Sequence, residues 1–304
     1  MQAIIDLGTN IFHLLIAEVK DGIIYEKYQK QIGVKIGEGG INNGKITPEA
    51  FERGMQALEQ FSKTIRSFQI EKTTAIATSA IRNAANGDDF IKAAYDRFNF
   101  SISAISGKEE ADLIFRGVSE SFDLPDENVL IMDIGGGSVE FILAKKDIIY
   151  YTQSFEIGTT RLFEKFKPSN PIEPKETKAI ITYLGTVLLP LSKAIYEHPV
   201  KKLVGSAGCF ETLVDVFLKD FQITPISVSK NADSIPKNLF GSFYHLMVGS
   251  NQNQRSRLQG LIPFRIEMIV VATVLINYCV ETFQIEEIIA SRYALKEGIL
   301  FANS

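Results

Sequence analysis

Short apolar runs and amphipathic stretches follow one another along the chain in an order typical of an α/β protein. Residues 3–5 and 130–132 are apolar, and each run leads into an Asp-x-Gly turn and then a second apolar run. Short apolar runs bounded by turn residues predict strand, tight turn and strand. A helix is predicted from Pro48 to about residue 68, because Thr47 suits the N-cap and proline suits the first helical position.

The second half of the chain continues the same mixture of elements. A helix is predicted after Glu173-Pro174, running to about residue 196, and residues 234–283 have a mostly helical pattern. A strand at residues 285–290 then leads into a last helix at residues 293–302. Helices and strands that alternate in this way favour an α/β fold.

The chain also repeats itself at a constant spacing. Asp6 and Asp133 are 127 residues apart, and so are Ser79 and Ser206, each of which follows an apolar run and precedes a helical pattern. Two pairs of motifs at one spacing indicate the duplication of a structural unit. The turn-like residues after 122 place the boundary there, so we expect one domain at residues 1–122 and a second at 123–290. The last helix, residues 291–304, is expected to pack back on the first domain.

Composition narrows the class of protein. The chain has 304 residues, enough for about two domains, with 45% hydrophobic and 22% charged residues and a net charge of -4. This balance gives no global attraction to nucleic acid or to an anionic membrane, so neither is expected as a partner. Two cysteines and three scattered histidines make no disulfide framework or metal cluster. The N-terminus has no signal-peptide pattern and residues 268–280 are too short to span a bilayer, so we expect a cytoplasmic protein.

The two Asp-x-Gly turns are the clearest candidates for chemistry. A turn of this kind presents several backbone N–H groups to one anion. The aspartates cannot bind phosphate directly because like charges repel, so Asp6 and Asp133 are candidate ligands of Mg²⁺, which would bridge to phosphate. The alternative is a pair of glycine hairpins with Asx-turns. The three consecutive glycines of DIGGGS favour the phosphate interpretation, because they are costly unless something approaches the backbone closely.

Three charged side chains near these turns could take part. Glu140 lies on the strand after the second turn, on the face opposite Val139 and Phe141; it is either a site residue or a solvent-facing carboxylate. In the helix after residue 105, Glu109 has capping-box spacing from Ser106, whereas Glu110 lies on the flank of the apolar stripe. A general base on this helix would therefore be Glu110 rather than Glu109.

Arginines supply the positive charge that a polyanion needs. Arg82 begins a helix, where its charge opposes the helix dipole, so it is either a phosphate fork or a surface residue. Arg255, Arg257 and Arg265 are further local candidates in the helical part of the second half.

The segments DLGTN, GEGG, ATSAIR, ISGKEEA, DIGGGSVE and GSAG occur in this order. Together they resemble the exopolyphosphatase / guanosine pentaphosphate phosphohydrolase family, in its short two-domain form, within the actin-like ATPase superfamily. The resemblance implies a duplicated actin-like (ribonuclease H-like) α/β fold with an active-site cleft between two domains. It also implies hydrolysis of the terminal phosphoanhydride of polyphosphate, or of guanosine pentaphosphate, with Mg²⁺ or another divalent cation as cofactor.

The resemblance assigns roles to particular residues. Glu110 matches the catalytic glutamate that activates water, and Asp133 and Glu140, with Asp6, are the expected metal ligands. The expected phosphate contacts are Thr9, Asn10, Arg82, Gly135, Gly136, Gly137, Ser138, Ser206 and Arg265. The sequence departs from the family pattern at Val139, where threonine is common, and at the GSAG turn, which puts nucleotide contacts in doubt.

Two other functions remain open at this point. A small-molecule kinase of the same superfamily would need an acceptor pocket, for which there is no distinct motif. A guanosine polyphosphate sensor without activity is disfavoured by the presence of Glu110. The sequence does not choose between polyphosphate and guanosine pentaphosphate, and a homodimer is expected only from the resemblance.

Overall fold

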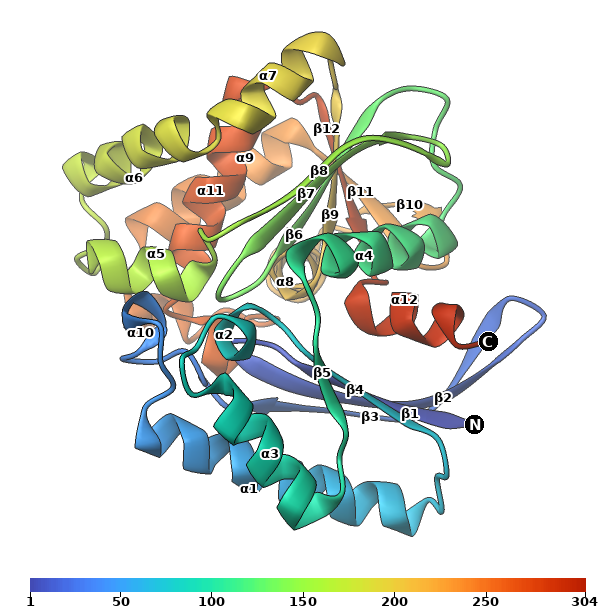
Figure 1. The fold of residues 1–304 in the computed structure, drawn as a ribbon. Coiled ribbons are helices and arrows are strands. Elements are labelled where there is room, and N and C mark those ends of the chain that lie inside the picture. The colour runs from blue at the N-terminus through green and yellow to red at the C-terminus, as the bar shows by residue number, and fades with distance from the viewer.

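The computed structural model describes all 304 residues, which build two mixed β-sheets, one from each half of the chain (Figure 1). The first sheet has the strand order β3-β2-β1-β4-β5 and the second β10-β11-β12-β9-β6-β7-β8. The strands of the first sheet are β1 Gln2–Leu7, β2 Ile11–Lys20, β3 Ile23–Gly33, β4 Thr73–Ala77 and β5 Ile102–Ala104. Those of the second are β6 Val129–Ile134, β7 Val139–Lys145, β8 Ile148–Phe155, β9 Lys202–Ser206, β10 Ile226–Ser229, β11 Ala232–Pro236 and β12 Glu287–Ser291.

The two sheets share one topology, which confirms the predicted duplication. In each half three antiparallel strands are followed by two strands that join the sheet in parallel: β1 pairs in parallel with β4 and β4 with β5, as β6 does with β9 and β9 with β12. The second half adds the antiparallel strands β10 and β11 beside β12. This is the duplicated actin-like α/β fold that the sequence predicted.

Helices cover the outer faces of both sheets and fill the space between them (Figure 1). The helices of the first half are α1 Pro48–Ser67, α2 Ser79–Arg82, α3 Gly87–Phe98 and α4 Gly107–Ser121, with a 3-10 turn η1 at Ile41–Asn43. Those of the second are α5 Thr159–Phe166, α6 Pro174–Val187, α7 Leu189–Glu197, α8 Gly208–Lys219, α9 Lys237–Gly249, α10 Gln252–Arg255, α11 Ile269–Thr282 and α12 Leu295–Ala302, with η2 at Pro263–Arg265. Helices α1 and α3 lie outside the first sheet and α6, α9 and α11 outside the second, whereas α4 and α12 lie between the sheets.

Three apolar cores correspond to these layers. One core joins the first sheet to α1 and α3, and the largest joins the second sheet to its outer helices. The third contains Ile4 and Leu15 from the first sheet, Ile131 from the second, and Ile114 and Ile299 from α4 and α12. This central core holds the two halves together through the pair of helices between them.

Most predicted helix boundaries are confirmed. Helix α1 begins after Thr47, whose hydroxyl accepts the Ala50 N–H at 3.3 Å. The single helix expected to residue 196 is wrong, because α6 ends at Val187 and α7 starts at Leu189 with a 64° bend. Pro190 lies in the first turn of α7, where its ring and missing N–H prevent a continuous helix.

The last strand and helix begin two residues later than predicted, at Glu287 and Leu295. Helix α12 packs along α4 and contacts β1 and β2. The Lys72 Nζ donates to the Asn303 carbonyl at 3.1 Å, which ties the end of the chain to the first half. No single helix has both the length and the apolar character needed to cross a bilayer. Helices α6 and α7 have them only when taken together, and this pair is bent.

Helices α4 and α12 cross where both carry glycine. A Cβ atom on Gly117 would lie 2.3 Å from the Ala294 carbonyl oxygen, and one on Gly298 would lie 1.9 Å from the Leu113 carbonyl oxygen. Neither position has room for a methyl group while the helices stay at this distance. The crossing therefore fixes the start of α12 against α4, and both helices contribute side chains to the cavity described below.

Replacing Gly117 by alanine should lower the free energy of unfolding by roughly 1–3 kcal/mol, because the methyl group forces the two helices apart. Gly241→Ala is the matched control, since its Cβ would meet nothing within 4 Å and alanine favours the helix. Urea unfolding of both variants checks the expectation. Equal or greater stability of Gly117→Ala would contradict the close crossing.

Candidate active site

A cavity of about 140 Å³ lies between the two halves. Its walls come from the turns after β1 and β6, the start of α8, the segment around η2 and the facing sides of α4 and α12. The predicted site residues in its lining are Asp6, Thr9, Asn10, Glu110, Asp133, Gly135, Gly136, Gly137, Ser138 and Arg265. Segments far apart in the sequence are thus brought to one place, as the duplicated turns predicted.

The two Asp-x-Gly turns contact each other directly. A Cβ atom on Gly136 would lie 2.9 Å from the Thr9 Cβ, and one on Gly137 would lie 2.6 Å from the Ser79 Oγ. Gly136 and Gly137 are therefore required by the close approach of the first half, whereas a Cβ on Gly135 would meet the Ser138 carbonyl oxygen of its own turn at 3.0 Å. The prediction that something approaches this backbone closely is confirmed, and in this structure it is the partner turn.

Four carboxylates gather in and beside the cavity: Glu110, Asp133 and Glu140 are at most 7% exposed, and Asp6 is partly buried. Burial, followed by the charge of Glu110, raises the pKa of Asp6 to about 7. Burial also raises the pKa of Asp133 to about 6 and that of Glu140 well above its ordinary value, with Glu110 and Asp133 adding repulsion at Glu140. The protein therefore concentrates negative charge where water cannot solvate it.

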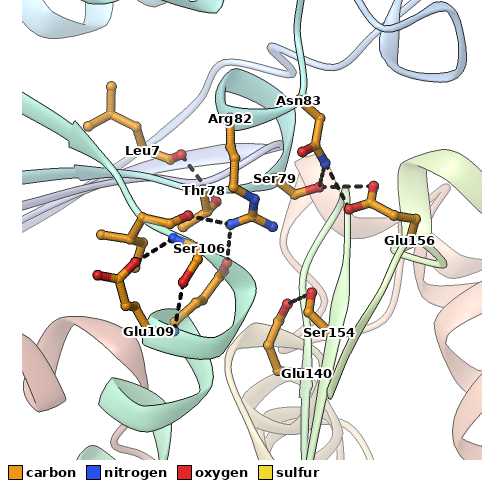
Figure 2. A network of polar contacts seen from close by, with 12 residues as sticks. Leu7, Thr78, Ser79, Arg82, Asn83, Ser106, Glu109, Glu140, Ser154 and Glu156 are labelled. Atoms are coloured by element: carbon orange, nitrogen blue, oxygen red, sulfur yellow. Dashed lines mark hydrogen bonds and ion pairs between the residues drawn. The ribbon is translucent and has the colours of Figure 1, made fainter. Parts of the chain in front are cut away.

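Glu110 is the most distinctive of the four. It is buried on the flank of α4, as predicted, and its Oε2 accepts from the Arg82 Nη1 at 2.8 Å. Burial raises the pKa of Glu110 to about 7 even though Arg82 acts in the opposite direction. Its neighbour Glu109 is exposed and forms the predicted capping box with Ser106 (Figure 2).

Arg82 is the last residue of α2, so the expectation that it begins a helix and opposes the dipole is wrong. It is placed instead to orient Glu110. Its Nη1 donates both to Glu110 and, at 2.8 Å, to the Ile105 carbonyl, and the side chain is mostly buried. No protein acceptor contacts its Nε or Nη2, so these donors could still bind phosphate. Arg82 is not part of the cavity lining, and its role as a phosphate contact stays a prediction.

Two serines hold the acids of the second half. The Ser154 Oγ donates to Glu140 at 2.6 Å (Figure 2), and the Ser206 Oγ donates to Asp133. Ser206 is fully buried and does not line the cavity; its hydroxyl holds Asp133 in place, and its role as a phosphate contact stays a prediction. Glu140 is likewise buried beside the cavity rather than facing solvent, because β7 is covered on both faces.

His13 was not predicted from the sequence as a site residue, although the 127-residue spacing between the two halves pairs it with Glu140. Asp6 is the cross-strand partner of His13, as Asp133 is of Glu140, so His13 and Glu140 occupy equivalent positions. His13 lines the cavity and its Nδ1 has no partner. Burial, with the charges of Lys296 and Arg265, lowers the pKa of His13 to about 3, which keeps it neutral.

Polar contacts across the interface were also missed. The Arg161 Nε donates to the Gly137 carbonyl at 2.8 Å and its Nη1 to the Ile41 carbonyl at 3.0 Å, while Nη2 pairs with Glu156. Glu156 also accepts from the Asn83 Nδ2 at 2.7 Å (Figure 2). Arg161 therefore joins the second turn to the first half, and no sequence motif marks it.

Of the three arginines in the helical region, only Arg265 lines the cavity. Its Nη1 donates to the Gly208 carbonyl at 2.5 Å and to the Thr212 Oγ1 at 2.8 Å, and Nη2 lies 3.6 Å from Glu211. The guanidinium covers the start of α8 so closely that a Cβ on Gly208 would lie 1.9 Å from it. Arg265 brings a cation to the cavity; its Nη1 donates to the protein, whereas its Nε and Nη2 make no hydrogen bond within the chain.

The donor set suits a hard divalent cation bound with water. The Asp6 Oδ1 is buried and has no hydrogen-bond partner, and the neighbouring carboxylates repel one another. No three His, Cys, Asp or Glu side chains lie close enough together to hold a metal ion between them. Mg²⁺ commonly binds through one or two carboxylates and keeps several waters, so these residues fit it without a complete protein cage.

A duplicated actin-like fold with two glycine turns and buried acids around one interdomain cavity defines a phosphate-handling enzyme of the actin-like superfamily. The sequence model of the Ppx/GppA phosphatase family matches residues 15–304. The chain belongs to this family, whose members are phosphoanhydride hydrolases.

Individual relatives agree with this assignment. A crystal structure of an exopolyphosphatase from Cytophaga hutchinsonii has 34% identity and a TM-score of 0.94, covering 99% of this chain and 97% of that one. The Aquifex aeolicus member of the Ppx/GppA family has 25% identity and a TM-score of 0.80, over 99% and 96% of the two chains. A bifunctional 3-dehydroquinate synthase/phosphatase of Fusobacterium nucleatum is 32% identical over 98% of this chain, which spans only 46% of that protein's length.

Replacing Asp6 by asparagine should stabilise the protein at alkaline pH. The pKa of Asp6 is 3.8 in the unfolded chain and about 7 in the folded protein, so the folded protein binds the Asp6 proton more tightly. This tighter binding stabilises the fold fully below pH 3.8, and the stabilisation is lost as the pH rises through about 7. The asparagine side chain carries no charge that must be buried. The Tm of the Asp6→Asn variant should therefore exceed that of the wild type by a few degrees at about pH 8.

Thermal unfolding at a series of pH values measures this difference, with Asp112→Asn as an exposed control. The gain should shrink as the pH falls towards 5. A gain that stayed constant with pH would show that the buried charge of Asp6 is not its origin.

Proposed function

We propose that this protein is an exopolyphosphatase that hydrolyses the terminal phosphoanhydride of inorganic polyphosphate and releases orthophosphate. One observation carries the proposal: the buried carboxylate of Glu110, oriented by Arg82, lines the same cavity as both glycine turns. A base and two candidate phosphate-binding turns are thereby brought to one place. The description of the Cytophaga hutchinsonii relative as an exopolyphosphatase supports the same substrate.

Glu110 acts as the general base. A carboxylate with a pKa of about 7 is a much better proton acceptor at neutral pH than one with its ordinary value. The Arg82 contact at 2.8 Å fixes which oxygen faces the guanidinium and leaves the other for water. Glu110 therefore orients the water and removes its proton as it attacks the terminal phosphorus.

The remaining residues position the phosphate chain. The turns at residues 8–10 and 135–138 both line the cavity and would offer backbone N–H groups to the phosphate chain, except that of Gly135, which donates to the Ser138 carbonyl at 3.0 Å. One or two of the carboxylates of Asp133, Asp6 and Glu140 would hold Mg²⁺ directly, and the ion, which keeps several waters, would neutralise charge on the phosphate oxygens. Phosphoryl transfer depends mainly on such positioning and electrostatics.

Glu110→Gln should reduce the rate of phosphate release from long-chain polyphosphate by at least about 100-fold, the usual contribution of a positioned general base. Glu109→Gln is the matched control. Glu109 is the exposed residue next to Glu110, and glutamine can replace glutamate in its capping box. In the wild type, kcat/KM should rise with pH through about 7 as Glu110 loses its proton.

Malachite-green detection of phosphate, with Mg²⁺ present, measures these rates on polyphosphate and on guanosine pentaphosphate side by side. Comparable rates for the two variants would rule out Glu110 as the base. Faster release from guanosine pentaphosphate would replace the proposed substrate. No release from either, with the protein folded, would overturn the hydrolase proposal.

A further inference from the structure

The side chain of Lys296 is buried, which is energetically unfavourable for an ammonium group, and the proposed mechanism gives it no role. It is the second residue of α12, only 7% exposed, and lines the cavity together with Asp6 and Glu110. Lysine is rarely buried to this extent, and removing an ammonium group from water costs several kcal/mol. Its place in the first turn also opposes the helix dipole.

The protein contacts of Lys296 use only part of its hydrogen-bonding capacity. Its Nζ donates to the Glu297 Oε1 at 2.9 Å, and no other acceptor lies within hydrogen-bond distance. Glu297 is held in turn by the Ala294 N–H, 2.9 Å from its Oε2. An ammonium group has three N–H donors, so two of them lack a protein partner.

An unsatisfied acceptor in the same cavity, the Asp6 Oδ1, does not take these donors. Asp6 is close enough to Lys296 for each charge to shift the pKa of the other, yet the two do not form a hydrogen bond and the Asp6 Oδ1 has no partner. Both side chains line the cavity. Donors and an acceptor left open in one cavity indicate a polar ligand between or beside them.

The charge of the lining indicates what that ligand is. Its acids are Asp6, Glu110, Asp133 and Glu211, and its only cations are Arg265 and Lys296. Arg265 donates through Nη1 to Gly208 and Thr212, and its Nη2 lies 3.6 Å from Glu211. A polyanion in this cavity therefore finds charged donors without a hydrogen-bond partner on Lys296 as well as on the Nε and Nη2 of Arg265.

We propose that Lys296 is a substrate-binding residue whose ammonium group donates to a phosphate oxygen of the polyphosphate chain in the cavity between the two halves. The inference rests on the proposed function, because it takes oligophosphate as the ligand. Lys296 thereby offsets the negative charge of the carboxylates, which would otherwise repel the chain from the site. Glu297 holds the ammonium in place and has no contact with substrate.

Two substitutions separate this role from a purely structural ion pair. Lys296→Met removes the charge and keeps the length of the side chain, whereas Glu297→Gln removes the partner and keeps Lys296 and an acceptor for the Ala294 N–H. Both break the pair and should lower Tm to a similar extent. Only Lys296→Met should weaken binding of tripolyphosphate, by about tenfold or more, as expected for losing a charge-assisted hydrogen bond.

The test is calorimetric titration of tripolyphosphate with Mg²⁺ into the two variants, each carrying Glu110→Gln to prevent turnover. An affinity within about twofold of the parent for Glu297→Gln, beside the loss for Lys296→Met, supports the substrate contact. Equal weakening in both variants, or no weakening in either, overturns it. If Lys296→Met does not fold, the double variant Lys296→Met/Glu297→Gln replaces it, because it leaves no unpaired buried charge.

The failure of the hydrolase proposal would be recognised separately. A wild type that binds tripolyphosphate but releases no phosphate from long polyphosphate refutes the activity, and the two variants still decide the contact. A parent that does not bind tripolyphosphate at all refutes both. Lys296→Arg, which keeps the charge, should restore at least part of the affinity lost in Lys296→Met, and failure to do so contradicts a contact based on charge.

Discussion

The burial of several carboxylates in one cavity is the constraint on which the rest of this structure depends. Asp6, Glu110, Asp133 and Glu140 all have raised pKa values because water is excluded and because they repel one another. Such a cluster destabilises the fold at neutral pH unless something supplies positive charge. The protein supplies part of it through Arg82, Arg265 and Lys296, and a divalent cation would supply the remainder.

Duplication explains how the cluster is assembled. Each half places an aspartate at the end of its first strand, and the two halves meet so that Asp6 and Asp133 line one cavity. Their cross-strand partners then differ, His13 in one half and Glu140 in the other, so the two halves no longer play equal parts. The proposed base comes from outside the repeated turns, on the helix α4 between the sheets.

The same two helices connect the site to the packing of the whole molecule. Helices α4 and α12 cross at Gly117 and Gly298 with no room for side chains, and one carries Glu110 while the other carries Lys296. The polar contacts of Arg161 with both halves close the opposite side of the interface. A movement of one half relative to the other would therefore change the distances between Glu110, the two glycine turns and Lys296 at the same time.

The features that could be predicted from the sequence are those set by a short stretch of the chain. The turns at Asp6 and Asp133, their spacing and the choice of Glu110 over Glu109 could all be predicted, because glycine geometry and helix periodicity are local properties. The break between α6 and α7 was visible only as Pro190. The partner of Ser206, the burial of Lys296 and the bridge made by Arg161 depend on contacts between residues far apart in sequence, which no local pattern contains.

A crystal structure of the Glu110→Gln variant with Mg²⁺ and tripolyphosphate tests the central claim most directly, namely that the two turns and the acids between them form one phosphate site. The account predicts that the terminal phosphate contacts backbone N–H groups at residues 8–10 and at residues 135–138, with the glutamine side chain facing its phosphorus. A tripolyphosphate bound to one half alone, or outside the cavity, would contradict it.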